Sequence, residues 1–137
     1  MNAKQFLKQA YRLNELILSN QRELDDLKVM STSIGSIDHA ADRVQTSPSG
    51  DARYTSIVAK IIELEKEIQE DIDKLFALKI EIRNAINDLD DNDEKLILKN
   101  RYLNFMTWDQ IGQELHMSAR TMKRKEASAL DHIQVPD

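Results

Sequence analysis

Positive charge is concentrated in one short segment near the end of the chain, HMSARTMKRKEASAL, residues 116–130. The segment carries four cationic side chains: Arg120, Lys123, Arg124 and Lys125. Guanidinium and ammonium groups bind DNA phosphates, and a guanidinium can donate two hydrogen bonds to a guanine edge. Because the 137-residue chain has a formal net charge of -5, binding to nucleic acid would have to come from a local patch. The residue types therefore indicate DNA contact through one helix.

A helix through this segment separates the cations from the apolar side chains. With about 3.6 residues per turn, the cations at 120, 123 and 124 and Ala127 point away from the apolar face. That face contains Met122, Ala129 and Ile133, with Leu130 beside it. Its expected packing partners come from earlier in the chain: Leu98, Tyr102, Trp108, Ile111 and Leu115. A cationic helix face also occurs as an ordinary solvated surface, so the preceding elements decide between the two interpretations.

Capping signals predict a bundle of three short helices. The predicted N-caps and helices are Asp91 before 92–104, Thr107 before 108–116 and Ser118 before a helix that ends near 133. Glu94 and Gln110 each stand three residues after a cap, which is the capping-box spacing. Only a tight turn separates the last two helices. Two helices joined in this way, the second with a basic outer face, predict a helix-turn-helix that docks in a DNA major groove.

Two longer amphipathic segments precede this bundle. Residues 1–30 carry a heptad seam with one polar member: Phe6, Ala10, Leu13, Ile17, Asn20, Leu24 and Leu27. Residues 55–89 carry an apolar stripe: Ile57, Ile61, Leu64, Ile68, Ile72, Leu75, Leu78, Ile82, Ile86 and Leu89. Residues 31–54 are rich in Ser, Thr, Gly, Pro and Asp and predict a flexible linker.

These elements predict an all-α fold. A long helical hairpin or coiled coil is followed by a C-terminal three-helix domain over residues 90–137. The two amphipathic helices can bury their stripes against each other within one chain. They can also pair between two chains, which would give a homodimer, and the pattern does not choose between these arrangements.

The composition excludes several classes of protein. The chain has no cysteine, so a disulfide framework and a cysteine-based zinc site are excluded. No run approaches the roughly 20 apolar residues of a membrane-spanning helix, and the N-terminus lacks the apolar core of a signal peptide. The sequence offers no nucleophile with its base, no paired-carboxylate site and no phosphate-binding glycine loop. We therefore expect a cytoplasmic protein with no enzymatic activity, cofactor, metal site or membrane association.

The segment LKNRYLNFMTWDQIGQELHMSARTMKRKEASAL resembles region 4 of the sigma-70 family, the part of a bacterial sigma factor that binds an upstream promoter element. The similarity covers roughly residues 90 to 133. Its elements are RYL at 101–103, the Thr107 cap before DQIGQEL, Ser118 with Met122 four residues later, and EASAL at 126–130. The whole chain is similar to phage and prophage late-transcription regulators of the ArpU/RinA kind (DUF1492-like). In that group a VQ.SP loop, here Val44–Pro48, precedes the same helix-turn-helix.

The resemblance implies a sequence-specific transcriptional regulator that binds double-stranded DNA in the bacterial host cell. It implies that bases are recognised by Arg120, Lys123 and Arg124, with Ala119 at the helix start. It makes Arg101, Thr107 and Thr121 candidates for phosphate contact. Two positions depart from the sigma pattern. The residue at 119 is polar in many sigma factors, and Lys125 occupies a position that is often apolar, where its stem can still cover the core.

Two other functions fit the same elements. Small-terminase-like DNA packaging proteins also combine a helix-turn-helix with helical oligomerisation elements, and they would form rings of many subunits. A protein-interaction module that binds RNA polymerase is the other alternative, because sigma region 4 also contacts the polymerase.

Overall fold

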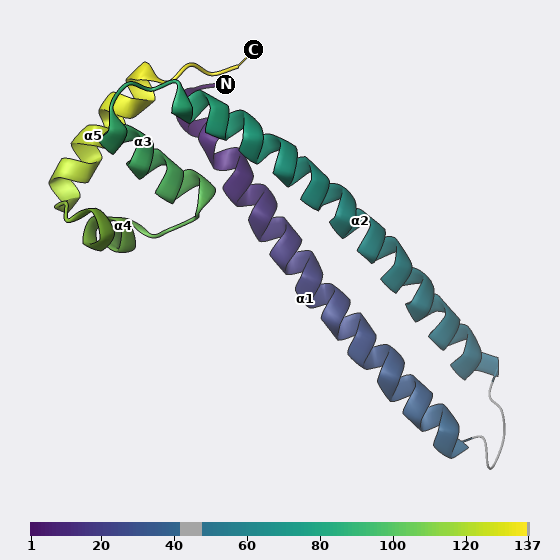
Figure 1. Ribbon diagram of the computed structural model, residues 1–137. Helices are drawn as coiled ribbons and strands as arrows, with labels where there is room; N and C mark the ends of the chain where they lie inside the picture. The colour runs from purple at the N-terminus through teal and green to yellow at the C-terminus, as the bar shows by residue number, and fades with distance from the viewer. Residues whose placement is uncertain (42–47, 137) are drawn as a thin grey trace. The chain divides into compact units, whose positions relative to one another are not determined.

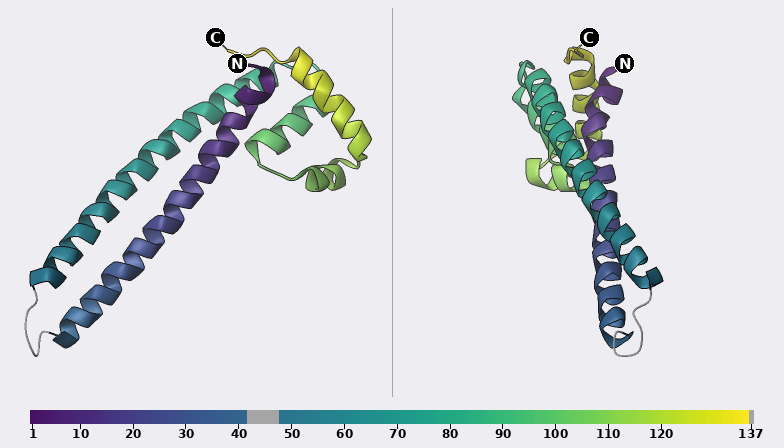
Figure 2. Two further views of the ribbon diagram at one scale, coloured as in Figure 1. Left: turned by 180° about the vertical axis from the view of Figure 1, so that it is seen from behind. Right: turned by 90° about the vertical axis from the view of Figure 1, so that its right-hand side faces the viewer.

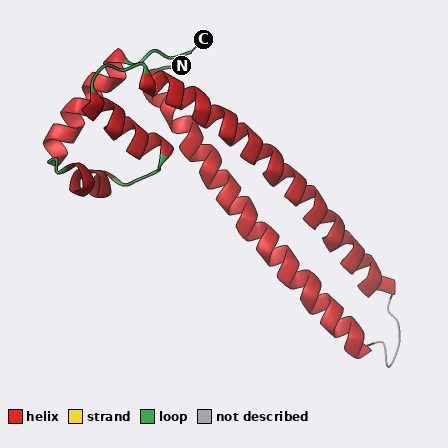
Figure 3. Ribbon diagram, in the orientation of Figure 1, coloured by secondary structure: helices red, strands yellow, loops and turns green. Residues whose placement is uncertain are grey.

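The computed structural model describes residues 1–41 and 48–136, and these residues form helices and loops without any strand (Figure 3). The elements in chain order are α1 (Ala3–Ala41), α2 (Pro48–Asn87), α3 (Asn92–Leu98), the π-helical segment η1 (Lys99–Leu103), α4 (Trp108–Leu115) and α5 (Ala119–His132) (Figure 1). The prediction of an all-α fold is confirmed. None of the helices in the described ranges is long and apolar enough to cross a membrane.

The chain divides into two compact units. The first contains Met1–Asn14 and Lys74–Asp137, and the second is Glu15–Asp73. Within the second unit, the segments of α1 and α2 lie side by side and run in opposite directions (Figures 1 and 2). Lys28 Nζ lies 3.9 Å from Glu65 Oε1 and so joins the two helices. Among the side chains of this unit whose burial is described, the buried apolar ones are Ile17, Ile57, Leu64 and Ile68.

The predicted linker over residues 31–54 is wrong for most of its length. Helix α1 continues to Ala41 and α2 begins at Pro48, so most of that stretch is helical. Proline is well suited to the first position of a helix, because its missing N–H would have no intrahelical partner there. Residues 42–47, and with them most of the expected Val44–Pro48 loop, lie outside the described residues.

Side-chain hydrogen bonds accompany the polar part of α1 that composition alone assigned to the linker. Ser31 Oγ and Thr32 Oγ1 both donate to the carbonyl oxygen of Lys28, at 2.8 and 3.0 Å. Serine and threonine inside a helix satisfy their hydroxyl groups in this way without interrupting the backbone ladder. A local rise in polar residues therefore does not end the helix.

The seam of the second unit differs from the predicted stripe at one position. Ile72 was expected to be buried, but it is 38% exposed, whereas the neighbouring Asp71 is only 8% exposed. Successive buried positions of a helical seam can be three or four residues apart, and after Ile68 the next buried position in this helix is three residues further on. In α1, the predicted polar seam residue Asn20 is partly buried, and its Nδ2 has no hydrogen-bond partner among the described residues.

The first unit contains the core that holds the short helices. The first turns of α1 and the last turns of α2 pack with α3, η1 and α5 around one cluster of buried side chains. Its fully buried members are Leu7, Ala10, Ile82, Ile86, Leu98 and Ala129. Burying each leucine or isoleucine stabilises the fold by about 1.5–3 kcal/mol. The short C-terminal helices are therefore fixed on the base that α1 and α2 provide within this unit.

Helices α4 and α5 are joined by three residues and approach each other closely. His116 ends α4 in the left-handed conformation, with φ 55, and its N–H donates to the Gly112 carbonyl oxygen. Gly112 faces α5, because a Cβ there would lie 2.9 Å from Met122 Cε and 3.0 Å from the Met117 carbonyl oxygen. The tight connection expected before α5 is therefore present, and a glycine makes the close contact possible.

Candidate nucleic-acid interface

Two of the three predicted caps fix the start of α4 and α5 as expected. Thr107 Oγ1 accepts the Gln110 N–H at 3.2 Å, and Gln110 Oε1 accepts the Thr107 N–H at 2.9 Å, which completes a capping box. Ser118 Oγ accepts the Thr121 N–H at 3.2 Å. These short-range bonds set where α5 begins, and therefore which of its residues face outward.

The two faces of α5 are separated as the helical wheel predicts. Its inner face consists of Met122, Ala129 and Ile133, which are at most 7% exposed. Its outer face is exposed and consists of Ala119, Arg120, Lys123, Arg124 and Ala127. The three cations of this outer face, at 120, 123 and 124, are called the cationic face below. None of them forms an ion pair with another described residue, so their charges are available to a partner.

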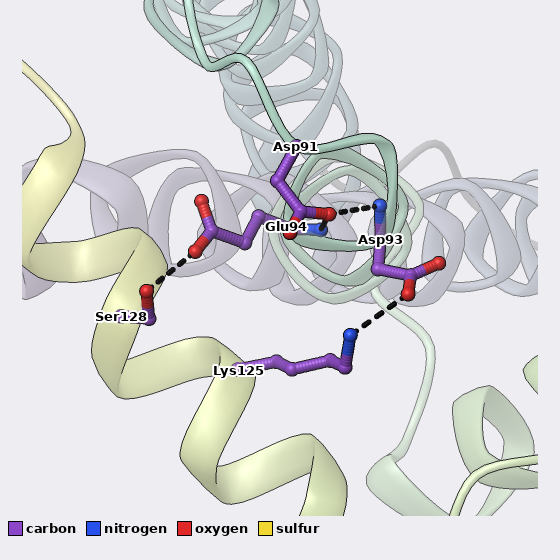
Figure 4. A network of polar contacts seen from close by, with 5 residues as sticks. All are labelled: Asp91, Asp93, Glu94, Lys125 and Ser128. Carbon is purple, nitrogen blue, oxygen red and sulfur yellow. Dashed lines mark hydrogen bonds and ion pairs between the residues drawn. The ribbon is translucent and has the colours of Figure 1, made fainter.

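A polar network ties α5 to the start of α3 (Figure 4). Ser128 Oγ donates to Glu94 Oε1 at 2.6 Å, and Glu94 is only 5% exposed. Lys125 Nζ donates to Asp93 Oδ2 at 2.8 Å. The hydrogen bond to Asp93 is the main reason why the pKa of Lys125 is raised above 10.5. The fourth cation of the segment is thus compensated within the protein, and it is not part of the cationic face.

The predicted capping box at α3 is wrong in one half. Asp91 Oδ1 accepts the N–H groups of Asp93 and Glu94 at 2.8 and 3.3 Å, so Asp91 is the N-cap. The Glu94 side chain does not return to the Asp91 backbone, because it bonds Ser128 instead. A tertiary contact to α5 has replaced the local one, which the spacing of the residues could not reveal.

The residues expected to contact phosphates are partly engaged inside the protein. Arg101 Nη1 donates to the Met106 carbonyl oxygen at 3.0 Å, and its guanidinium lies 5.0 Å from the centre of the Trp108 ring. Thr107 caps α4, although its side chain is exposed. The Thr121 hydroxyl accepts a hydrogen bond from Ser118 Oγ at 3.0 Å. The structure therefore leaves the cationic face as the main group of uncommitted polar side chains on α5.

Three further cations lie near α5 that the sequence did not single out. Lys4, Lys8 and Arg12 of α1 line one cavity together with Ala119 and Lys123. The signal for them is their spacing of four residues, which places them on one side of α1. What could not be foreseen is that this side of α1 faces α5, more than 100 residues later in the chain.

Tyr102 anchors the inner side of α5 in the same unit. The Tyr102 hydroxyl donates to Glu126 Oε2 at 3.5 Å, and the tyrosine is 3% exposed. Burial, followed by the negative charge of Glu126, raises the pKa of Tyr102 to about 12. Among the described residues, no group of three or more His, Cys, Asp or Glu side chains is placed to hold a metal ion.

Comparison with known proteins gives one match. The model of a family described as "Protein of unknown function (DUF1492)" matches residues 33–134, which is more than half of the chain. No curated protein matches, and no solved structure matches.

Proposed function

Because the chain belongs to the DUF1492 family, whose function is unknown, we propose a function from its own residues. The protein is a DNA-binding transcriptional regulator, encoded by a phage or prophage, of the ArpU/RinA kind. It recognises double-stranded DNA with a helix-turn-helix like that of sigma-70 region 4, formed by α4 and α5. It has no enzymatic activity and acts in the cytoplasm of the bacterial host.

The observation that carries this proposal is the cationic face of α5. A helix of 14 residues presents three uncompensated cations outward while its opposite face is buried. A major groove is about 12 Å wide and admits one helix. The residues near the start of such a helix contact base edges, and Arg120 and Lys123 lie in its first two turns.

Each cation of the face suits a different kind of contact. A guanidinium is planar and can donate two parallel hydrogen bonds to guanine O6 and N7, so Arg120 and Arg124 are the residues that select bases. The Lys123 ammonium is a compact charge that suits a phosphate or a single acceptor. Thr107 and Thr121 stand at the helix starts, where hydroxyl and backbone N–H groups hold phosphates. Arg101 supports the interface from behind, through its contact with Trp108.

The compensated cation Lys125 supports the same interpretation. Its ammonium is directed to Asp93 rather than outward, so the segment divides its positive charge between anchoring and recognition. A merely solvated helix face gives no reason for this division. The neighbouring hydrogen bond from Ser128 to Glu94 fixes the rotation of α5 about its own axis, and base recognition requires a fixed rotation.

Selection of preferred sites from a random pool of duplexes tests this proposal. The wild-type protein should enrich one motif. Arg124→Ala should bind that motif more weakly by about 1–3 kcal/mol and should relax preference at one base pair, if Arg124 contacts a guanine. Lys66→Ala, an exposed lysine of α2 in the other unit, is the matched control and should leave the motif unchanged. Enrichment of no motif by the wild-type protein would contradict sequence-specific binding.

A homodimer is part of the proposal, because apolar side chains remain exposed on α2. Phe76 is 69% exposed and Ile80 is 46% exposed, and a spacing of four residues puts them on one side of the helix. Side chains of this size are buried when two copies of a helix pair. A dimer would also place two α5 helices on two half-sites. A ring of many subunits would instead favour the packaging alternative, and retention of RNA polymerase without DNA binding would favour the interaction module.

A further inference from the structure

A cavity of about 520 Å³ lies within the first unit, beside the inner edge of the cationic face. Its walls come from the first turns of α1, the segment from η1 to the start of α4, and the first half of α5. Small-molecule sites are usually concave spaces of about 300–1,000 Å³ with largely apolar walls and a few polar groups. The volume of this cavity lies within that range.

Aromatic side chains are concentrated around the cavity. The chain has only seven aromatic residues, and four of them line this space: Tyr11, Tyr102, Phe105 and Trp108. The Tyr11 and Phe105 rings pack edge to face, with centroids 5.8 Å apart and planes at 69°. Tyr11 nevertheless remains 47% exposed. Tyr102 is buried, and one face of Phe105 and one face of Trp108 are covered by Lys79 and Arg101. Tyr11 is therefore the accessible ring against which a planar ligand can pack.

The backbone around the cavity is unusual at two places. Phe105 has a positive φ of 57, a conformation that is strained for a residue with a bulky side chain. The preceding segment, Lys99–Leu103, is π-helical, and it places Arg101 and Tyr102 in the cavity wall. Short π-helical segments and strained residues are both frequent at functional sites. The backbone conformation therefore supports a functional role for this cavity independently of the side-chain types around it.

Charge around the cavity is strongly positive. Five cations line it, Lys4, Lys8, Arg12, Arg101 and Lys123, against a single carboxylate, Glu126. That carboxylate accepts the hydrogen bond of Tyr102. None of the five cations forms an ion pair with another residue in the described part of the chain. Five cations around one carboxylate give this space a positive potential, which attracts an anion.

We propose that this cavity binds a small organic anion that carries a planar aromatic ring, such as a mononucleotide or an aryl carboxylate. The ring packs against Tyr11, and the phosphate or carboxylate group is held by the cations of α1 and by Lys123. A volume of about 520 Å³ is that of a small-molecule site.

The ligand would also regulate DNA binding, and this part of the inference rests on the proposed function. Lys123 belongs both to the cavity wall and to the cationic face. An anion that engages its ammonium removes a charge from the DNA-binding surface and adds a negative charge beside it. The ligand should therefore weaken DNA binding, and DNA should weaken ligand binding by the same factor.

Trp108 makes ligand binding directly measurable, because it is the only tryptophan of the chain and it lines the cavity. We would titrate the full chain with adenosine monophosphate and with phenylacetate, and follow tryptophan fluorescence. At least one of the two should give a saturable change. Adenosine, which lacks the anion, and inorganic phosphate, which lacks the ring, should each bind about tenfold or more weakly, since a charge-assisted hydrogen bond or a ring contact is lost. The stronger of the two anions shows whether the site prefers a nucleotide or an aryl carboxylate.

Two exposed residues of α1 provide variants that leave α5 intact. Lys8→Ala and Tyr11→Ala should each weaken the saturable binding by about tenfold, while the matched control Lys66→Ala should leave it unchanged. A saturable response that is equal in all three variants would overturn the assignment to this cavity. Absence of a saturable response to either small anion would overturn the proposed ligand class.

The effect of the ligand on DNA binding is measured in a separate experiment. Added ligand should reduce the affinity of wild-type protein for its selected duplex and should have little effect on that of Lys8→Ala. Because the fluorescence titration contains no DNA, saturable ligand binding without any DNA binding would leave the site in place and would remove only the proposed function and the coupling. Equal DNA affinity with and without saturating ligand would overturn the regulatory part of the inference.

Discussion

Replacing Ser128 by alanine should loosen the attachment of α5 to α3. Ser128 Oγ donates a 2.6 Å hydrogen bond to Glu94 Oε1, and the Glu94 side chain is only 7% exposed. The second group near that oxygen is His132 Nδ1, at 3.6 Å, and the His132 side chain is 65% exposed. After the substitution, the carboxylate stays buried but has lost its closest donor. Hydrogen bonds to charged groups contribute about 1.5–3 kcal/mol, and we expect Ser128→Ala to reduce the free energy of unfolding by that amount.

A comparison inside the same network sharpens this prediction. Lys125→Ala removes the bond to Asp93, whose side chain is 46% exposed, so water replaces the lost partner. It should therefore destabilise less than Ser128→Ala. Glu94→Gln removes the charge that makes the serine bond strong, and Ser128→Ala should cost less in that background than in the wild type.

Urea unfolding measures these differences. Fluorescence of Trp108 reports on the unit that contains α3, α4 and α5, and circular dichroism follows all helices together. A loss below about 0.5 kcal/mol for Ser128→Ala is within the range of ordinary surface substitutions and would refute the argument for a buried, essential donor. The same conclusion would follow if Lys125→Ala were the more damaging variant.

Three further predictions concern packing, pH and assembly. Gly112→Ala should destabilise the protein by about 1 kcal/mol, because its Cβ would meet the Met117 carbonyl oxygen at 3.0 Å and this contact outweighs the gain in helix propensity. Urea unfolding measures the difference, with Gln113→Ala, at an exposed position, as control. A Gly112→Ala variant more stable than the wild type would contradict the close contact. Burial raises the pKa of Tyr102 from 10.0 to about 12. Because the folded protein resists ionisation of this tyrosine, the free energy of unfolding should fall by about 2–3 kcal/mol as the pH rises from 10 to 12, and should not be affected by Tyr102 below pH 10. Tyr102→Phe should lack that part of the pH dependence, and identical profiles above pH 10 would be inconsistent with the assignment. Phe76→Glu should convert a dimer into a monomer in light scattering, whereas a monomeric wild-type protein would rule out the dimer.

Features set by local chemistry could be predicted from the sequence. The caps at Thr107 and Ser118 depend on a side chain and a backbone N–H three residues apart, and both are present. The two faces of α5 follow from the helical repeat, and Met122 and Ala129 are buried as expected. The all-α class follows from long amphipathic patterns with few glycines and prolines.

Features that depend on distant partners could not be predicted. The polar residues after Met30 indicated a linker, yet α1 continues to Ala41 with Ser31 bonded to its own backbone. By periodicity alone the seam could pass through position 71 or 72, and the structure buries Asp71 rather than Ile72. The cavity joins Lys4, Lys8 and Arg12 to α5, and no local pattern connects residues so far apart in sequence.

The salt dependence of DNA binding tests the central claim most directly. Each phosphate that a cation neutralises contributes about one unit to the slope of log affinity against log salt. We would compare the wild-type chain with a variant that carries Arg120→Ala, Lys123→Ala and Arg124→Ala, and with a control that carries Lys60→Ala and Lys66→Ala on α2. Loss of specific binding, together with a slope reduced by about one unit for the phosphate contact of Lys123 in the first variant only, is the result that we predict. Equal affinity and equal slope in all three proteins would contradict the assignment of α5 as the DNA-binding helix.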